Sequence, residues 1–280
     1  MKRVKETLGI WPAYIWMVVV FVIPMFYIIF ISFCEKGENW GIIYHFTFSN
    51  YKKILDPLYL GIIAKSFGVA AFTTVITLLV GYPFAYFLTF FSKTLQRILI
   101  FLLIVPFWTN AIIRIYGWII IMQGEGVVNT FLGSFGIDKI KMLYTNGAVQ
   151  LGTIYTLLPL MILPIYNSVE KIDKSLLEAA RDLGADGWTV FRTVIWKLSL
   201  PGVMSGCLMV FVPSIGFFYI SDMLGGSNIM LLGNLIKNQF LEARDWPFGA
   251  ALSVVMAFLA ILLIGIYKKF TNGKKVDLLL

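Results

Sequence analysis

The sequence predicts an all-α polytopic membrane protein with six transmembrane helices. Two features of its composition support this prediction: 59% of the 280 residues are hydrophobic and only 14% are charged. A soluble domain carries roughly 25% charged residues, so this chain lacks the polar surface that a soluble fold of its length needs. A third feature is that no polar stretch is longer than a loop. Residues 1–280 are therefore expected to form a single transmembrane domain.

Six apolar segments are long enough to cross a bilayer as helices. The first follows Lys2, Arg3 and Lys5. It is longer than the apolar region of a signal peptide and has no small-residue cleavage site, so it is expected to be an uncleaved helix. Prolines interrupt most of the segments, which membrane helices tolerate because neighbouring helices satisfy the freed carbonyls. The predicted spans cover about 11–33, 66–91, 98–122, 147–166, 201–221 and 248–267.

Basic residues are unevenly distributed between the two sides of the predicted spans. Fourteen lysines and arginines fall on the side of both termini and of the loop at about 167–200, and seven fall on the other side. Because positively charged loops stay in the cytoplasm, both termini and this loop are expected to be cytoplasmic. The same bias accounts for the net charge of +8, so the basic composition gives no reason to infer a nucleic-acid partner.

The chain lacks the residues of a metal site and of a catalytic site. It contains one histidine, His45, and two cysteines, Cys34 and Cys207, which are too few for a metal cluster. It has no G-x-x-x-x-G-K-[ST] loop to hold nucleotide phosphates, and no G-x-S-x-G or H-E-x-x-H motif. The chain is therefore expected not to be an enzyme and to bind no cofactor itself.

The loop between the fourth and fifth predicted spans reads as two short helices. Residues 176–183 are expected to form the first, which Gly184 ends, as glycine does at helix C-termini. Glu178 is placed in the first turn, where the helix dipole favours a carboxylate. The second helix is expected over about 188–198. The apolar face of the first helix is expected to comprise Leu176, Leu177, Ala180 and Leu183.

Four residues of this loop have the spacing of a known motif: Glu178, Ala179, Ala180 and Gly184. The loop resembles the EAA loop, by which ABC-importer permeases dock onto a cytoplasmic ATPase. Trp196-Lys197 stands where that family usually has Leu-Pro, so the end of the docking segment departs from the pattern. The resemblance implies that the four residues couple this chain to an ATPase that holds ATP and Mg²⁺. The alternative is an ordinary amphipathic cytoplasmic loop.

Further stretches resemble a narrower group, the B-type permease subunit of spermidine/putrescine ABC importers. They include Phe-Trp-Thr-Asn at 107–110, Arg-Ile-Tyr-Gly at 114–117 and Arg-Asp-Trp-Pro-Phe-Gly at 244–249. The resemblance runs from the first span to the last and implies the type I ABC-importer permease fold in a bacterial inner membrane. It also implies a heterodimer with a second related permease, two copies of an ATPase, and an extracytoplasmic binding protein that delivers the polyamine.

A polyamine requires carboxylates for its ammonium groups and aromatic faces for both the cations and the methylenes. Asp222, at the outer end of the fifth span, has Tyr219 one helical turn earlier, and Gly225-Gly226 allows the chain to turn back over them. Glu125, at the outer end of the third span, is the second candidate carboxylate. The candidate wall residues of the path are Trp108, Tyr116 and Tyr155. The alternative is that these residues do not line the path, because aromatic residues are 16% of the chain and most of them are expected to face lipid or other helices.

Arg114 lies inside the third predicted span, where an arginine is costly unless it is paired or reaches the interface. Its charge repels a polyamine, so a direct contact with the substrate is not expected. The hypothesis is an ion pair with Asp222 or Glu125 that holds a closed, gated state. The alternative is that the side chain extends to the outer interface.

Three other functions compete with polyamine import. A related ABC importer could carry another small solute, and Glu178 and Gly184 do not distinguish the two. A secondary transporter driven by an ion gradient would need acidic residues in the middle of its spans, and these spans have essentially none. An intramembrane enzyme lacks its catalytic motif.

Overall fold

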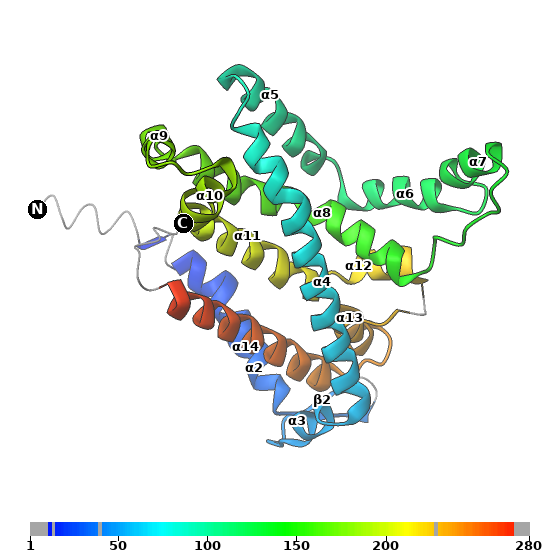
Figure 1. Cartoon of the computed structure of the whole chain (residues 1–280). Helices are drawn as coiled ribbons and strands as arrows, with labels where there is room; N and C mark the ends of the chain where they lie inside the picture. Colours follow the sequence, from blue (N-terminus) through cyan, green and yellow to red (C-terminus); the bar gives the residue numbers. More distant parts are fainter. Residues whose placement is uncertain (1–10, 13–14, 39–40, 227–228, 272–280) are drawn as a thin grey trace, which may run out of the picture. The chain divides into compact units, whose positions relative to one another are not determined.

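The structure is a computed structural model that describes residues 11–12, 15–38, 41–226 and 229–271 (Figure 1). The basic residues at the two ends of the sequence, Lys2, Arg3, Lys5, Lys274 and Lys275, lie outside the described residues. Within the described ranges, six helices are long and apolar enough to cross a membrane, which confirms the predicted fold class. They are Ile15–Ser32, Pro57–Leu88, Ala111–Ser134, Asn146–Glu170, Gly187–Gly216 and Trp246–Tyr267.

The chain divides into two compact units. The smaller unit contains residues 1–61 and 235–262, and the larger contains 62–234 and 263–280. The predicted coupling loop and all the predicted substrate-path residues belong to the larger unit.

The smaller unit is built around the first apolar helix and the segment that follows it. A π turn at Val18–Val22 continues into α2 (Ile23–Ser32), then β1 (Glu35–Lys36) pairs antiparallel with β2 (Ile42–Ile43), and α3 covers Ser49–Ile54. The Asn50 amide donates to the carbonyl oxygens of Ser32 at 3.0 Å and Cys34 at 2.8 Å. These two bonds hold α3 against the end of α2.

The stretch at 244–249, in the same unit, contains the turn before α14 (Trp246–Thr271) and the first residues of that helix. One carboxylate oxygen of Asp245 accepts from the backbone N–H of Phe248 at 3.2 Å, and the other lies 3.3 Å from Lys53 Nζ. The Lys53 ammonium also lies 4.0 Å from the centre of the Phe248 ring. Asp245 therefore caps α14 and is itself held by Lys53 of α3. The Arg-Asp-Trp-Pro-Phe-Gly stretch thus has a structural role.

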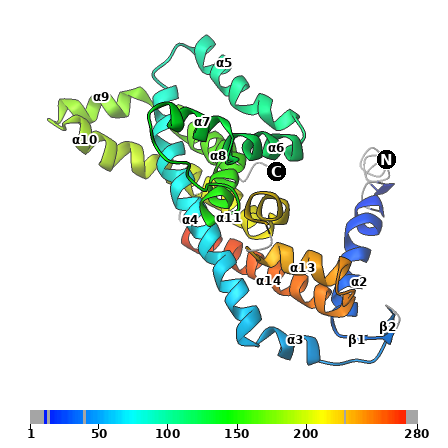
Figure 2. The same cartoon turned by 90° about the vertical axis from the view of Figure 1, so that its right-hand side faces the viewer.

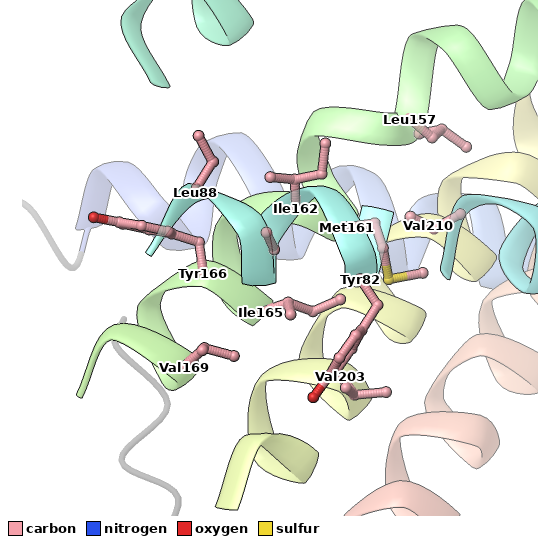
Figure 3. Packing of buried hydrophobic residues seen from close by; sticks show 11 residues of the cluster. Tyr82, Leu88, Leu157, Met161, Ile162, Ile165, Tyr166, Val169, Val203 and Val210 are labelled. Atoms are coloured by element: carbon pink, nitrogen blue, oxygen red, sulfur yellow. The ribbon is translucent and has the colours of Figure 1, made fainter. Parts of the chain in front are cut away.

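The larger unit is centred on α4 (Pro57–Leu88), α8 (Asn146–Glu170) and α11 (Trp196–Gly216). Helices α8 and α11 pack side by side in opposite directions (Figure 1). A Cβ atom at Gly202 would lie 2.4 Å from the Pro164 carbonyl oxygen, so only glycine allows this approach. The core between the helices comprises Tyr82, Ala85, Leu88, Leu157, Met161, Ile162, Ile165, Tyr166, Val169, Val203 and Val210 (Figure 3).

The third span differs from the prediction of one helix over 98–122. The structure has α5 (Lys93–Ile104) and a 3₁₀ turn at Val105–Trp108, and the candidate span Ala111–Ser134 that follows is itself divided into α6 (Ala111–Met122) and α7 (Val127–Ser134). Pro106 has no N–H to continue the helix, and Thr109 is extended. The Asn110 side chain then caps α6 by accepting from Ile112 N at 2.8 Å. The break therefore follows from local chemistry in the Pro-Phe-Trp-Thr-Asn stretch.

The fifth span also differs, because its helix begins well before the predicted residue 201. The run α10 (Gly187–Val190), a π turn at Phe191–Ile195 and α11 is continuous through Pro201. The predicted separate helix over 188–198 is the first part of this run. The helix ends at Gly216, and α12 (Phe218–Ile220) and a π turn at Ser221–Gly225 follow.

Candidate functional site

The first helix of the predicted coupling loop is α9, Lys174–Asp182. Asp173 caps it by accepting from Ser175 N at 3.0 Å, and this bond lowers the pKa of the Asp173 carboxyl below its usual range. Glu178 is the fifth residue of the helix, so its predicted place in the first turn was wrong. The negative charge at the helix N-terminus is supplied by Asp173 instead.

Gly184 ends α9 in the left-handed conformation, with φ of +83°. The Gly184 N–H donates to Arg181 O at 2.8 Å, and the Ala185 N–H donates to Ala180 O at 3.1 Å. These bonds satisfy carbonyls that the helix end would leave without partners. Asp186 then caps α10 through Thr189 N at 3.2 Å. Figure 2 shows α9 and α10 as a hairpin that projects from the ends of α8 and α11.

The apolar residues predicted to share one face of α9 differ in burial. Leu177 and Ala180 are half-buried, whereas Leu176, Ala179 and Leu183 are exposed. Leu183 is 89% exposed. Because residues three and seven apart share a side of a helix, the exposed residues Leu176, Ala179 and Leu183 form an apolar stripe. An exposed apolar stripe on a short, capped helix is a surface suited to a protein partner.

Glu178 borders a groove of about 500 Å³ between α9 and the turn that joins α4 to α5. That turn is held in place by an ion pair between Lys93 and Glu170 at 2.7 Å, and by the Tyr166 hydroxyl, which donates to Gln96 Oε1 at 2.8 Å. Glu178 is exposed and forms no ion pair with any residue in the described part of the chain. Its carboxylate is thus available to a partner.

Asp222 is held by a residue that the sequence analysis did not identify. Its Oδ1 accepts a hydrogen bond from the Asn234 amide, which also donates to Phe218 O at 3.1 Å. Asn234 is buried in α13 (Leu232–Leu241). The only signal in the sequence was an amide directly after the Leu-Leu-Gly at 231–233. Tyr219 is half-buried, with its ring 5.4 Å from that of Phe217.

The remaining predicted path residues contact separate neighbours rather than one another. Glu125 is exposed and pairs with Lys139. Trp108 is 78% exposed and meets the Phe101 ring edge-on, at 6.1 Å between ring centres. Tyr155 meets Trp118 edge-on at 5.4 Å, and Tyr116 is exposed. Their role in the path remains a prediction.

Arg114 stabilises the break in the third span. Its Nη1 donates to Pro106 O at 2.6 Å, and the guanidinium lies 5.1 Å from the centre of the Phe107 ring. It forms no ion pair with a residue in the described ranges, so the hypothesised pair with Asp222 or Glu125 is not present in this structure. The Pro106 carbonyl oxygen also accepts from Thr109 N at 3.2 Å and from Thr109 Oγ1 at 2.7 Å, so Arg114 adds a third bond at the break, which is a structural role for this half-buried charge. A gating role remains a hypothesis.

The two candidate sites lie at opposite ends of the larger unit. Figure 1 places α9 and α10 at one end, and α6 and α7 at the other. Residue Glu125 lies between α6 and α7. The same arrangement is expected of a membrane protein that contacts a substrate on one side and a soluble partner on the other.

Comparison with known proteins identifies the family. Residues 74–275 match the binding-protein-dependent transport system inner membrane component family. The chain belongs to this family. As an inner membrane component of a transport system, it is a multi-pass membrane protein and a transporter subunit rather than an enzyme.

Within the family, the chain is similar to spermidine/putrescine transport system permease proteins named PotB. It is 43% identical to that of Escherichia coli K12 over 267 residues, which cover 94% of this chain and 97% of the relative. It is 40% identical to that of Haemophilus influenzae over the same length, which covers 93% of that relative. These relatives confirm the resemblance to the B-type permease.

The fold is shared with solved ABC importers. A chain of the bacterial alginate ABC transporter, solved with an alginate pentasaccharide-bound periplasmic protein, superposes with a TM-score of 0.79. The superposition covers 96% of this chain and 94% of the other at 14% identity. The likeness confirms the type I ABC-importer permease fold.

Proposed function

We propose that this chain is the permease subunit of an ATP-driven importer of polyamines, with spermidine and putrescine as substrates, and forms half of the translocation path. The observation that carries the proposal is the 43% identity to a spermidine/putrescine permease along nearly the whole of both chains. The similarity includes both the coupling segment and the spans, so it concerns the transport machinery as a whole and not one motif.

The coupling loop supports docking onto a cytoplasmic ATPase. Glu178 offers an exposed carboxylate, and Ala179 offers a small exposed surface that a partner can approach closely. Gly184 fixes the end of the helix that carries both. In this proposal two copies of the ATPase bind ATP and Mg²⁺, one copy docks here, and the other docks on a second, related permease.

The outer end of the path is proposed to receive the polyamine from an extracytoplasmic binding protein. In this proposal Asp222 supplies a carboxylate, and Tyr219, three residues earlier in the chain, supplies an aromatic face. A protonated amine gains both a charge-assisted hydrogen bond and a cation–π contact from such a pair. Asn234 donates to Asp222 Oδ1, which fixes the carboxylate for the arriving cation.

The substrate class is tested by stimulation of ATP hydrolysis. The chain is reconstituted with its second permease and ATPase, and the binding protein is added with spermidine, putrescine, an amino acid or a neutral sugar. We expect hydrolysis to rise with the two polyamines only. Stimulation by another solute and not by the polyamines would show that the chain serves a related importer with a different cargo.

The orientation is tested by cysteine labelling in intact cells. Cysteines replace Phe48, Asp138 or Asp186 in a chain from which Cys34 and Cys207 have been removed. Positions 48 and 138 are expected to react with a membrane-impermeant maleimide, and position 186 only after the cells are opened, because basic loops remain cytoplasmic. Labelling of position 186 from outside would reverse the topology and exclude cytoplasmic docking.

A further inference from the structure

A series of aromatic rings joins the coupling loop, at about 167–200, to α4. Trp188 stacks on Phe191 with 5.6 Å between ring centres. Phe191 in turn meets Tyr82 at 5.8 Å and Tyr86 at 5.9 Å, both edge-on. Trp196 meets Tyr82 at 5.2 Å. We call these five residues the aromatic linkage.

The π turn at Phe191–Ile195 allows both Phe191 and Trp196 to reach Tyr82. In an α-helix, residues five apart point about 140° away from each other. Here the Trp196 N–H donates to Phe191 O, the i→i+5 bond of a π turn, whose wider winding brings the two residues closer to one side of the helix. The irregular turn thus presents two rings to one tyrosine.

Tyr82 is fixed in the core at the far end of the linkage. It is 6% exposed and lies among Met161, Ile165 and Val203 (Figure 3). Its hydroxyl forms a hydrogen bond of 2.9 Å with Ser199 Oγ, and Ser199 is fully buried. The side chain is therefore tied both to α11 by its hydroxyl and to the core by its ring.

Burial increases steadily along the linkage. Trp188 is 67% exposed on the surface of the loop, Phe191 and Trp196 are half-buried, and Tyr82 is buried. Close-packed groups transmit displacements because there is no free space to absorb them. A movement of the projecting hairpin would consequently be passed to α4 through these rings.

We propose that Phe191 and Trp196 are positioning residues that transmit movement of the coupling loop to α4 through Tyr82. This inference rests on the proposed function, since it concerns how movement driven by ATP hydrolysis is transmitted from the ATPase to the helices of the substrate path. It also gives a role to the place where the chain departs from the EAA-loop pattern. Trp196 occupies the position of the usual Leu and contributes a ring that contacts α4.

The test measures movement of α4 directly, without reference to the substrate. A spin label is attached at position 79, using Leu79→Cys in a chain without Cys34 and Cys207. Leu79 is exposed on α4, outside the linkage. In the reconstituted complex, ATP with vanadate should change the label's spectrum. In Trp196→Ala the change should be largely lost while the ATPase stays bound, and Trp196→Phe should restore it. Phe72→Ala is the matched control: Phe72 is an exposed aromatic residue on α4, outside the linkage, and this variant should behave as wild type.

Uptake per ATP hydrolysed gives a second readout. We expect it to fall about tenfold in Trp196→Leu and in Tyr82→Leu, within the range of coupling free energies between protein sites. Because both residues belong to one linkage, the double variant should lose no more than the worse single variant.

A wild-type spectral change in Trp196→Ala would overturn the proposal. Dissociation of the ATPase from both Trp196→Ala and Trp196→Leu would also overturn it, since these residues would then serve docking. Failure of wild-type spermidine uptake with a normal spectral change would reject the substrate and leave the linkage standing.

Discussion

The Glu178→Arg variant is expected to insert into the membrane normally but to lose ATPase docking, and with it nearly all uptake. Glu178 is exposed, lies on a capped helix and has no ion pair within the described ranges, so the folded chain does not depend on it. Losing one partner of a desolvated charge pair at an interface costs roughly 2–5 kcal/mol, and reversing the charge adds repulsion. Docking should weaken by about a hundredfold or more.

Copurification of the ATPase with the tagged permease, together with uptake in proteoliposomes, measures this effect. Asp138→Arg makes the same charge change in an exposed loop on the opposite side and should leave both unchanged. Normal uptake by Glu178→Arg would remove the docking role from this residue.

The Gly184→Val variant is expected to weaken ATPase docking by changing the backbone conformation at the end of α9. A Cβ atom at position 184 meets no atom within 4 Å, so steric crowding is not the cause of any defect. The φ of +83° costs a β-branched residue about 1–2 kcal/mol, which should redirect the chain after α9. Gly184→Asn should retain more activity because asparagine tolerates this conformation. Gly187→Val is the matched control, with equal space and no positive φ.

The Asp222→Asn variant is expected to assemble normally and to take up spermidine about tenfold more slowly or worse. Asparagine keeps an oxygen that can accept the bond from the Asn234 amide, so the local structure should persist. What is lost is the charge, and a hydrogen bond to a charged group contributes roughly 1.5–3 kcal/mol.

Initial uptake rates at several spermidine concentrations give the size of the effect, and protein level and ATPase copurification give the control. Glu125→Gln should have a smaller effect, because Glu125 is exposed and already paired with Lys139. If Asp222→Asn transports at the wild-type rate, Asp222 only shapes the end of the fifth span and the polyamine enters elsewhere.

The sequence predicted those features that depend on composition or on one residue's conformational preference. Six apolar helices follow from long runs without charge, and the end of α9 follows from the left-handed preference of Gly184. The Glu178 carboxylate lies on the projecting hairpin, in agreement with the expected loop.

Features that depend on tertiary contacts were not predicted. The helix continues through Pro201 because the packing of α11 on α8 outweighs the local preference of proline. Of the apolar residues of α9, only Leu177 and Ala180 are half-buried, a difference that depends on what the helix packs against. Asn234 holds Asp222 across twelve residues of chain, and Arg114 bonds to a carbonyl rather than a carboxylate. No spacing rule in one sequence specifies such partners.

Uptake of labelled spermidine into proteoliposomes tests the central claim most directly. The vesicles contain this chain, its second permease and the ATPase, with the ATPase sites facing ATP and the binding protein on the other side. The proposed function predicts uptake that requires ATP, the binding protein and an intact Glu178, and that putrescine inhibits but a neutral sugar does not. Uptake that continues without ATP hydrolysis, or no spermidine uptake by a complex that transports another solute, would contradict it.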